Sequence, residues 1–340
     1  MATINIKGQV SYADLSPAQN VRVKIWELDL LPGGQNDLIF NKVVGADGKF
    51  AGESSRWDDR EGSSNIFPIG IVDAPDLSPN LSFEVTFEGS RHTGPFIANA
   101  HNSAPIILPP NFVKPVQKSE RDLVQIVYLV NDDYELPERA LYSFIEMGSS
   151  GFVDSSLRDD YRAVHHLQGS NATLANLKTK LTQVGARAGT EAIDLIFCTH
   201  GHTDKMVFAD GTKTTDQVLG VLDDIPQATR NKFRMLFSTA CFGNTHSQMW
   251  LNAGFACASG SEGVYADSEY SLLPFLESWA NRNTFRGAVG FANTGVVGNR
   301  GDDIAREYYR NTGKTDRVGE INSHRIVSGN GNLRIYSKPR

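Results

Sequence analysis

The chain has 340 residues, more than a single hydrophobic core usually organises, so two domains are expected. With 40% apolar and 21% charged residues the composition is that of a globular protein, and no apolar run approaches the roughly 20 residues that a membrane-spanning helix needs. The formal net charge of −6 disfavours a general nucleic-acid-binding protein, which would normally carry a basic stripe. The sequence therefore predicts neither a membrane nor a nucleic-acid partner.

The cysteines and the N-terminus bear on the cellular compartment. Cys198, Cys241 and Cys257 lie in the second half of the chain, inside or beside apolar runs, which is not the pattern of a disulfide framework. Residues 1–10 alternate like a strand and lack the apolar core of a signal peptide. We therefore expect a cytoplasmic protein.

The first 110 residues show the alternation of β-strands. Period-two runs separated by glycine-containing turns predict several short strands. The runs are 4–6, 21–26, 39–43 and 81–87, and the clearest turns are 32–34 and 46–48. Short strands with regular turns are typical of an antiparallel sandwich, so an all-β domain is predicted over 1–110.

This stretch resembles a transthyretin-like domain. The resemblance rests on an early strand with a V-x-V-x-I-W pattern and on a D-G-x-F turn after a strand pair. The matching segments are 8–10, 20–29, 36–39 and 46–50. The resemblance implies a binding or structural module without catalytic residues, and it makes the sandwich a surface for a protein partner.

Residues 111–122, a polar stretch that follows Pro109 and Pro110, form the predicted linker. Over 123–340 apolar runs alternate with helical periodicity, which is typical of an α/β domain with a mostly parallel sheet. The predicted strands are 123–130, 161–167, 193–201, 233–241 and 254–259. Helices are predicted after an N-cap at Asn171 or Thr173 and over 215–222, 268–281 and 302–310, with hairpins at 206–211 and 325–336.

Two of these apolar runs each end in a reactive residue. The first run ends in His200-Gly201, and the second, about forty residues later, ends in Ala240-Cys241. Because side chains at the carboxyl ends of neighbouring parallel strands converge on one crevice, we expect the imidazole and the thiol to lie together. The sequence therefore predicts a His–Cys dyad for nucleophilic catalysis.

The second domain resembles the caspase-like superfamily of cysteine peptidases, which includes caspases, legumain, gingipains, clostripain, separase and the CHAT domains. The resemblance is carried by an apolar block followed by His-Gly, a spacer, and a second apolar block followed by Ala-Cys. Residues 206–222 resemble the segment between the two catalytic residues, and 252–260 resemble the strand after the cysteine. The family implies hydrolysis of a peptide or protein substrate without a cofactor or a metal ion.

The chemistry explains the residue types. The Cys241 thiolate would attack the scissile carbonyl, and His200 would protonate the departing amine and then activate water. The backbone N–H groups of Gly201 and Cys241 are the candidate oxyanion donors. A glycine after the histidine suits this role, because the substrate must approach that backbone closely.

The family also implies where a specificity pocket lies: in the loop after the first strand, near the cysteine, and along the following strand. The candidate substrate-binding residues at those places are Asp132, Asp133, Thr239, Ser259, Glu262 and Asp267, with Asn131 and Ser261 beside them. Carboxylates predominate, and a partly desolvated carboxylate would select Arg or Lys before the scissile bond. A preference for Asn, as in legumain, is the main alternative.

Two other function classes remain open. Residues 199–204 match the first half of the H-x-H-x-D-H motif of metallo-β-lactamases, which would make a zinc hydrolase, although Lys205 stands where the motif has its last histidine. A catalytically silent interaction protein is the other alternative. Cys198 and Cys257 are expected to be buried small hydrophobes, and His246 to be structural or exposed.

Overall fold

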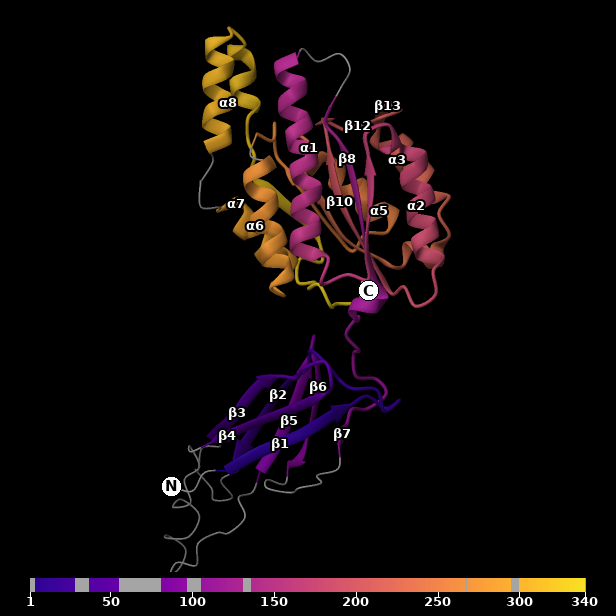
Figure 1. Cartoon of the computed structure of the whole chain (residues 1–340), viewed down its shortest axis with the longest axis vertical. Coiled ribbons are helices and arrows are strands. Elements are labelled where there is room, and N and C mark those ends of the chain that lie inside the picture. Colours follow the sequence, from indigo (N-terminus) through magenta and orange to yellow (C-terminus); the bar gives the residue numbers. More distant parts are fainter. Residues whose placement is uncertain are drawn as a thin grey trace, which may run out of the picture. The chain divides into compact units, whose positions relative to one another are not determined.

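The computed structural model describes residues 4–27, 37–54, 81–96, 105–130, 136–266, 268–294 and 300–339. The chain forms two compact units, residues 1–115 and 116–340 (Figure 1). The division between them falls within the stretch predicted as the linker. Strand β8 of the second unit begins at Arg121, two residues before the predicted domain start.

Within its described residues, the regular elements of unit 1 are strands. One sheet has the order β4-β1-β7 and the other the order β3-β2-β5-β6. The strands are β1 (Ile4–Ser11), β2 (Arg22–Glu27), β3 (Asp37–Val43), β4 (Lys49–Ser54), β5 (Leu81–Phe87), β6 (Ser90–Phe96) and β7 (Ile106–Ile107). Side-chain alternation along the strands explains the core. Val23, Ile25 and Val85 are fully buried, whereas Arg22, next to Val23 in β2, is exposed. The all-β architecture agrees with the sequence, and the likeness to a transthyretin-like domain stays a prediction.

Unit 2 is a mixed α/β unit built on a six-stranded sheet with the order β16-β15-β14-β10-β8-β9. All neighbouring pairs are parallel except β15 and β16. The strands are β8 (Arg121–Tyr128), β9 (Ala163–Gln168), β10 (Ala192–Thr199), β14 (Phe233–Ser238), β15 (Cys257–Ser261) and β16 (Arg325–Gly329). A smaller sheet contains β11 (Gly201–His202), β12 (Lys205–Phe208) and β13 (Gly211–Thr214).

Helices cover both faces of this sheet (Figure 1). On one face α2 (Leu174–Ala186), α3 (Thr215–Asp223) and α5 (Gly243–Ala253) bury side chains such as Leu181 and Trp250. On the other, α1 (Leu136–Leu157), α6 (Ser268–Ala280) and α7 (Phe285–Asn293) bury residues such as Phe275 and Trp279. The remaining helices are α4 (Gln227–Arg230), α8 (Arg300–Asn311) and the 3₁₀ turns η1 (Lys118–Glu120), η2 (Gly169–Asn171) and η3 (Thr315–Glu320). No helix in the described ranges combines the length and apolarity needed to cross a membrane.

The strand order positions the site. From β8 the chain passes through α1 to β9 on one side, and then returns to β10 on the other side of β8. The order therefore reverses between β8 and β10, and such a switch point opens a crevice at the carboxyl ends of the strands. Leu129 and His200 directly follow β8 and β10, and Cys241 is the third residue after β14, so all three lie at this edge.

Several elements differ from the sequence predictions. The hairpin predicted at 325–336 is wrong, because β16 pairs antiparallel with β15 from Ser261↔Arg325 to Cys257↔Gly329, and no strand follows it in the described residues up to 339. Helices α1, α5 and α7 are not predicted by the sequence. By contrast, Thr173 is the N-cap of α2, where its hydroxyl oxygen accepts the Asn176 N–H at 3.1 Å.

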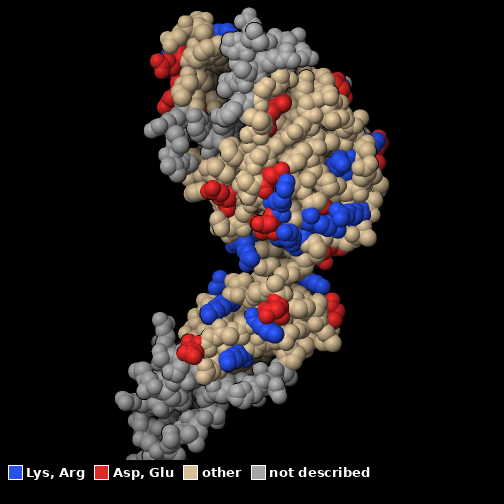
Figure 2. Space-filling view, viewed as in Figure 1, with Lys and Arg blue, Asp and Glu red and all other residues tan. Residues whose placement is uncertain are grey.

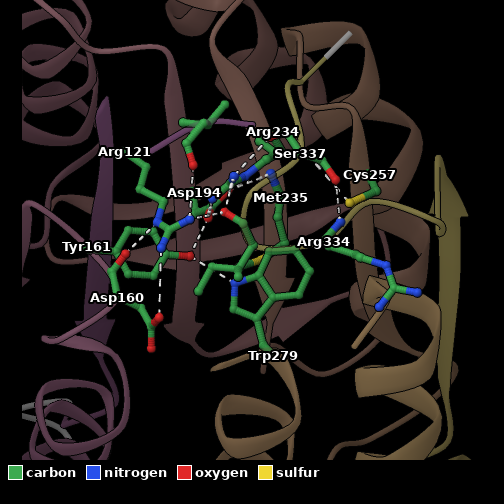
Figure 3. A network of polar contacts seen from close by, with 12 residues as sticks. Arg121, Asp160, Tyr161, Asp194, Arg234, Met235, Cys257, Trp279, Arg334 and Ser337 are labelled. Carbon is green, nitrogen blue, oxygen red and sulfur yellow. Dashed lines mark hydrogen bonds and ion pairs between the residues drawn. The ribbon is translucent and has the colours of Figure 1, made fainter. Parts of the chain in front are cut away.

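A buried polar network lies at the amino ends of the strands (Figure 3). The Arg234 guanidinium donates to both Asp194 oxygens, through Nε at 3.0 Å and Nη2 at 2.5 Å, and neither side chain is exposed. The Tyr161 hydroxyl donates to the same carboxylate, and Trp279 Nε1 donates to that hydroxyl at 2.9 Å. Arg234 also donates to the Ser337 carbonyl at 3.0 Å, so the network ties the C-terminal segment to the sheet.

The charged side chains on the surface of unit 2, unlike this buried network, form pairs that are open to solvent. In Figure 2 basic and acidic side chains lie beside one another on this unit. Its solvent-exposed pairs include Lys178–Asp224 at 2.8 Å. Such pairs are hydrated and each contributes little to stability.

Candidate functional site

His200 directly follows the buried strand β10, and Leu129 and Tyr142 both contact its ring. Its Nε2 lies 2.8 Å from the Leu129 carbonyl oxygen, and the Tyr142 ring meets the imidazole edge-on at 4.9 Å between centroids. Because a carbonyl oxygen can only accept, Nε2 carries the proton, which makes Nδ1 the basic nitrogen of the neutral ring. Burial lowers the pKa of His200, and the hydrogen bond to Leu129 offsets part of this effect. The imidazole is therefore neutral at pH 7.

Cys241 lies just beyond the end of β14 and just before α5. Its side chain is half-buried, and its Sγ accepts the Tyr265 N–H at 3.3 Å. Burial raises the pKa of the Cys241 thiol, and the Tyr265 N–H opposes that change. The sulfur therefore carries its proton at neutral pH, so a base is needed to generate the thiolate.

The backbone after Cys241 turns sharply into α5. Phe242 has a positive φ of 53°, which is rare for a residue with a side chain, and its N–H donates to the Gly263 carbonyl at 2.7 Å. Gly243 packs directly on Gly260 of β15: a Cβ atom on Gly260 would lie 2.1 Å from the Gly243 carbonyl carbon. Only glycine fits at this contact, which fixes the first turn of α5 against the sheet.

The backbones that carry the two reactive residues are in direct contact. A Cβ atom on Gly201 would lie 2.6 Å from the Cys241 carbonyl oxygen and 2.9 Å from the Ala240 Cβ. The strands leading to them pair in parallel, and beyond the last pair the Thr239 N–H donates to the Phe197 carbonyl at 2.8 Å. The fold thus brings His200-Gly201 and Ala240-Cys241 to the same edge of the sheet.

His246 also lies at this edge, although the sequence suggested only a structural or exposed residue. It is fully buried in the first turns of α5, and its Nε2 donates to the His202 carbonyl at 2.9 Å. One residue earlier, Thr245 Oγ1 accepts the Asp204 N–H at 3.0 Å. Helix α5 is therefore bonded to the turn that follows His200. Its position in the chain, five residues after Cys241, was the available signal. The sequence analysis missed it because it did not predict helix α5.

The residues predicted to bind substrate are placed differently from one another. Thr239 and Ser259 are buried, and the Thr239 hydroxyl contacts the Cys198 thiol. Neither presents its hydroxyl group to solvent in this structure. Glu262 is exposed and accepts a hydrogen bond from Asn322 Nδ2 at 3.2 Å. Asp132, Asp133 and Asp267, together with Asn131, lie outside the described residues.

A buried cation that the sequence did not indicate packs against Tyr265, the residue whose N–H donates to Cys241. The Arg325 guanidinium stacks 3.8 Å from the Phe237 ring centroid and 4.8 Å from that of Tyr265, the residue whose N–H contacts Cys241. Its Nη2 donates to the Ser238 carbonyl and lies 3.5 Å from Ser259 Oγ. Its Nε and Nη1 are buried without a hydrogen-bond acceptor, and no carboxylate among the described residues pairs with it. Burial lowers the pKa of Arg325, and its interactions with Tyr265 and Cys198 oppose this change.

The metal-site alternative requires several ligands at one place. Within the described ranges, no group of three or more His, Cys, Asp and Glu side chains is arranged to hold a metal ion. The side chains of His202 and Asp204 are exposed. The stretch that matches the metallo-β-lactamase motif therefore does not gather into a metal centre among the described residues.

Comparison with known proteins gives distant structural similarity and no sequence match. No protein-family model matches the sequence, and no curated protein matches it. Among solved structures, a caspase-1 from Spodoptera frugiperda is similar, with a TM-score of 0.42 and 12% sequence identity over 65% of this chain and 92% of that chain. A similarity at this level assigns no role to any residue.

Proposed function

We propose that unit 2 hydrolyses peptide bonds as a cysteine peptidase, with Cys241 as the nucleophile and His200 as its base. The observation that carries the proposal is the direct contact of Gly201 with the Cys241 backbone at the carboxyl ends of two adjacent strands. Because this contact brings the two segments together, one thiol, one neutral imidazole and two backbone N–H groups can act on the same substrate carbonyl group.

The proposed reaction begins with proton transfer. Nδ1 of His200 takes the thiol proton as Cys241 Sγ bonds to the carbonyl carbon, and the carbonyl oxygen becomes an oxyanion that accepts the N–H groups of Gly201 and Cys241. The carbon–nitrogen bond then breaks and His200 returns the proton to the leaving amine. Water, deprotonated by His200, hydrolyses the resulting thioester and restores the free thiol.

A chemical test separates the three function classes. Wild-type protein is assayed on a fluorogenic peptide panel before and after iodoacetamide treatment, and with or without a metal chelator. We expect activity to disappear with one adduct at Cys241, since Cys198 and Cys257 are buried, and to withstand the chelator. Loss of activity to the chelator alone would indicate a zinc hydrolase, and no cleavage of any peptide would indicate an interaction protein.

The pKa of His200 predicts the acid side of the activity profile. Because burial lowers this pKa below the ordinary value of about 6.5, the basic form of the ring persists as the pH falls through that value. We expect kcat/KM to decline only below about pH 6.5, since kcat/KM reports groups of the free enzyme. A decline centred at or above the ordinary histidine value would contradict the assignment of His200 as the base.

The preference for the residue before the scissile bond has two competing predictions. The sequence favours Arg or Lys through Asp132, Asp133, Glu262 and Asp267, of which the structure describes only the exposed Glu262. Arg325, buried and without a carboxylate partner among the described residues, favours an acidic side chain instead. We propose the acidic preference.

Matched peptides that differ only at this position test the preference. We expect Asp or Glu peptides to exceed Arg and Lys peptides by at least about tenfold in kcat/KM, and Arg325→Gln to remove the difference. Faster cleavage of Arg or Lys peptides would favour the carboxylates named by the sequence.

A further inference from the structure

We propose that His246 is a positioning residue that holds the Gly201 N–H in place for the oxyanion. This inference rests on the proposed peptidase function. His246 contacts no reacting atom in this account. It acts through the turn that joins His200 to β12.

The first observation is the direction of the Gly201 N–H. The Val207 N–H donates to the His200 carbonyl at 3.0 Å, so this carbonyl points toward β12. In a trans peptide the N–H of the next residue points the opposite way, so the Gly201 N–H points away from β12. Gly201 and Met206 are register partners of the non-hydrogen-bonded kind, which agrees with this direction. The oxyanion donor is therefore directed away from the small sheet and is not used in its ladder.

The second observation is how little room Gly201 has. A Cβ atom there would lie 2.6 Å from the Cys241 carbonyl oxygen, 2.9 Å from Ala240 Cβ and 3.1 Å from His246 Cε1. The α-carbon is thus packed between the cysteine segment and the imidazole of His246. A change in the His246 ring would move the donor relative to the nucleophile.

The third observation is the hydrogen bond on the next residue. His246 Nε2 donates to the His202 carbonyl at 2.9 Å, which fixes the far end of β11 to helix α5. Cys241 lies two residues before the first residue of α5, so the start of one short helix is next to the nucleophile and is bonded to the turn with the donor. Thr245 supports the same turn through Asp204.

The fourth observation is that packing alone does not explain a histidine here. His246 is fully buried, and its Nδ1 has no hydrogen-bond partner in the described structure. An apolar side chain of similar size would leave no buried nitrogen unpaired and would cost less free energy. Donation to the His202 carbonyl is what the imidazole supplies and an apolar residue cannot.

The test compares His246→Leu, which lacks the donor, with His246→Gln, whose amide nitrogen can reach the same carbonyl. Three quantities are measured in the full chain: peptide hydrolysis, alkylation of Cys241 by iodoacetamide, and inhibition by a peptide aldehyde. The aldehyde forms a thiohemiacetal whose oxygen needs the oxyanion donors, whereas alkylation does not. Gln248→Leu, an exposed position on the same helix, is the matched control.

We expect His246→Leu to lower kcat by about 10²-fold and to weaken aldehyde inhibition similarly, because misplacing one oxyanion donor has an effect of this order. KM and the alkylation rate should stay within about twofold, His246→Gln should recover most of the loss, and Gln248→Leu should match wild type. If His246→Leu does not fold, His246→Asn replaces it, since its shorter amide cannot span to His202.

Two results would overturn the inference alone: hydrolysis and aldehyde inhibition unchanged in His246→Leu, or alkylation falling in parallel with them. A wild-type protein that neither cleaves peptides nor binds the aldehyde would instead refute the proposed function, and the inference with it.

Discussion

Replacing His200 by alanine is expected to lower kcat/KM for peptide hydrolysis by about 10⁴-fold. Burial keeps the Cys241 thiol protonated, so without a base the nucleophile is scarce, and without an acid the leaving amine departs unprotonated. The iodoacetamide reaction of Cys241 should slow as well, because it needs the same thiolate. Steady-state kinetics and mass-spectrometric adduct mapping measure the two effects.

The control is His202→Ala, which removes an exposed side chain two residues away and leaves the backbone carbonyl that accepts from His246. This variant should retain wild-type hydrolysis. A zinc hydrolase that used the His200–Asp204 stretch would lose activity heavily in both variants, because both histidines would be metal ligands. Equal losses in both variants would contradict the assignment of His200 as the base.

The largest expected effect on stability is at the buried Asp194–Arg234 pair. Asp194→Asn keeps the shape of the side chain but leaves the Arg234 guanidinium without its counter-ion in a site with no exposure. Breaking a buried pair in this way costs about 3–5 kcal/mol of unfolding free energy. Urea unfolding followed by tryptophan fluorescence measures the change, since Trp250 and Trp279 are buried in this unit.

Asp224→Asn is the matched control, because it removes one partner of the exposed pair with Lys178 and should cost about 0–1 kcal/mol. A second variant separates charge from shape. Asp194→Leu combined with Arg234→Met replaces both ions by apolar groups and should be far less destabilising than Asp194→Asn. An Asp194→Asn protein as stable as the Asp224→Asn protein would contradict this account of the network.

The strands that carry the site could be predicted from the sequence because burial on both faces leaves an unbroken apolar run. Strands β10 and β14 are buried along their whole length, and their ends at His200 and near Cys241 follow from where the apolar runs stop. Thr173 as a helix N-cap was likewise a local signal, since capping depends on a single side chain.

The missed helices have weak local signals. Helix α1 contains a Gly-Ser-Ser-Gly stretch at 148–151, which lowers helix propensity, and it forms because Val153 and Leu157 pack against the sheet. Helix α5 begins directly after Phe242, whose backbone has a left-handed conformation that the sequence does not predict. Without α5, the place of His246 beside Gly201 could not be foreseen.

The hairpin predicted at 325–336 failed for a related reason. Gly329, Asn330 and Gly331 form a turn, but the segment before them finds its partner in β15 and not in the residues that follow. Strand pairing over long separations depends on tertiary packing, which also decides that Arg325 is buried beside Tyr265. Composition and spacing therefore could not place this cation beside Tyr265.

The most direct test of the central claim is peptide hydrolysis by wild-type and Cys241→Ala protein, purified and assayed side by side in the presence of a metal chelator. We expect wild-type cleavage to persist with the chelator and the alanine variant to lose at least about 10⁴-fold in kcat/KM, because its methyl group cannot form the thioester. Equal cleavage by the two proteins would show that Cys241 is not the nucleophile.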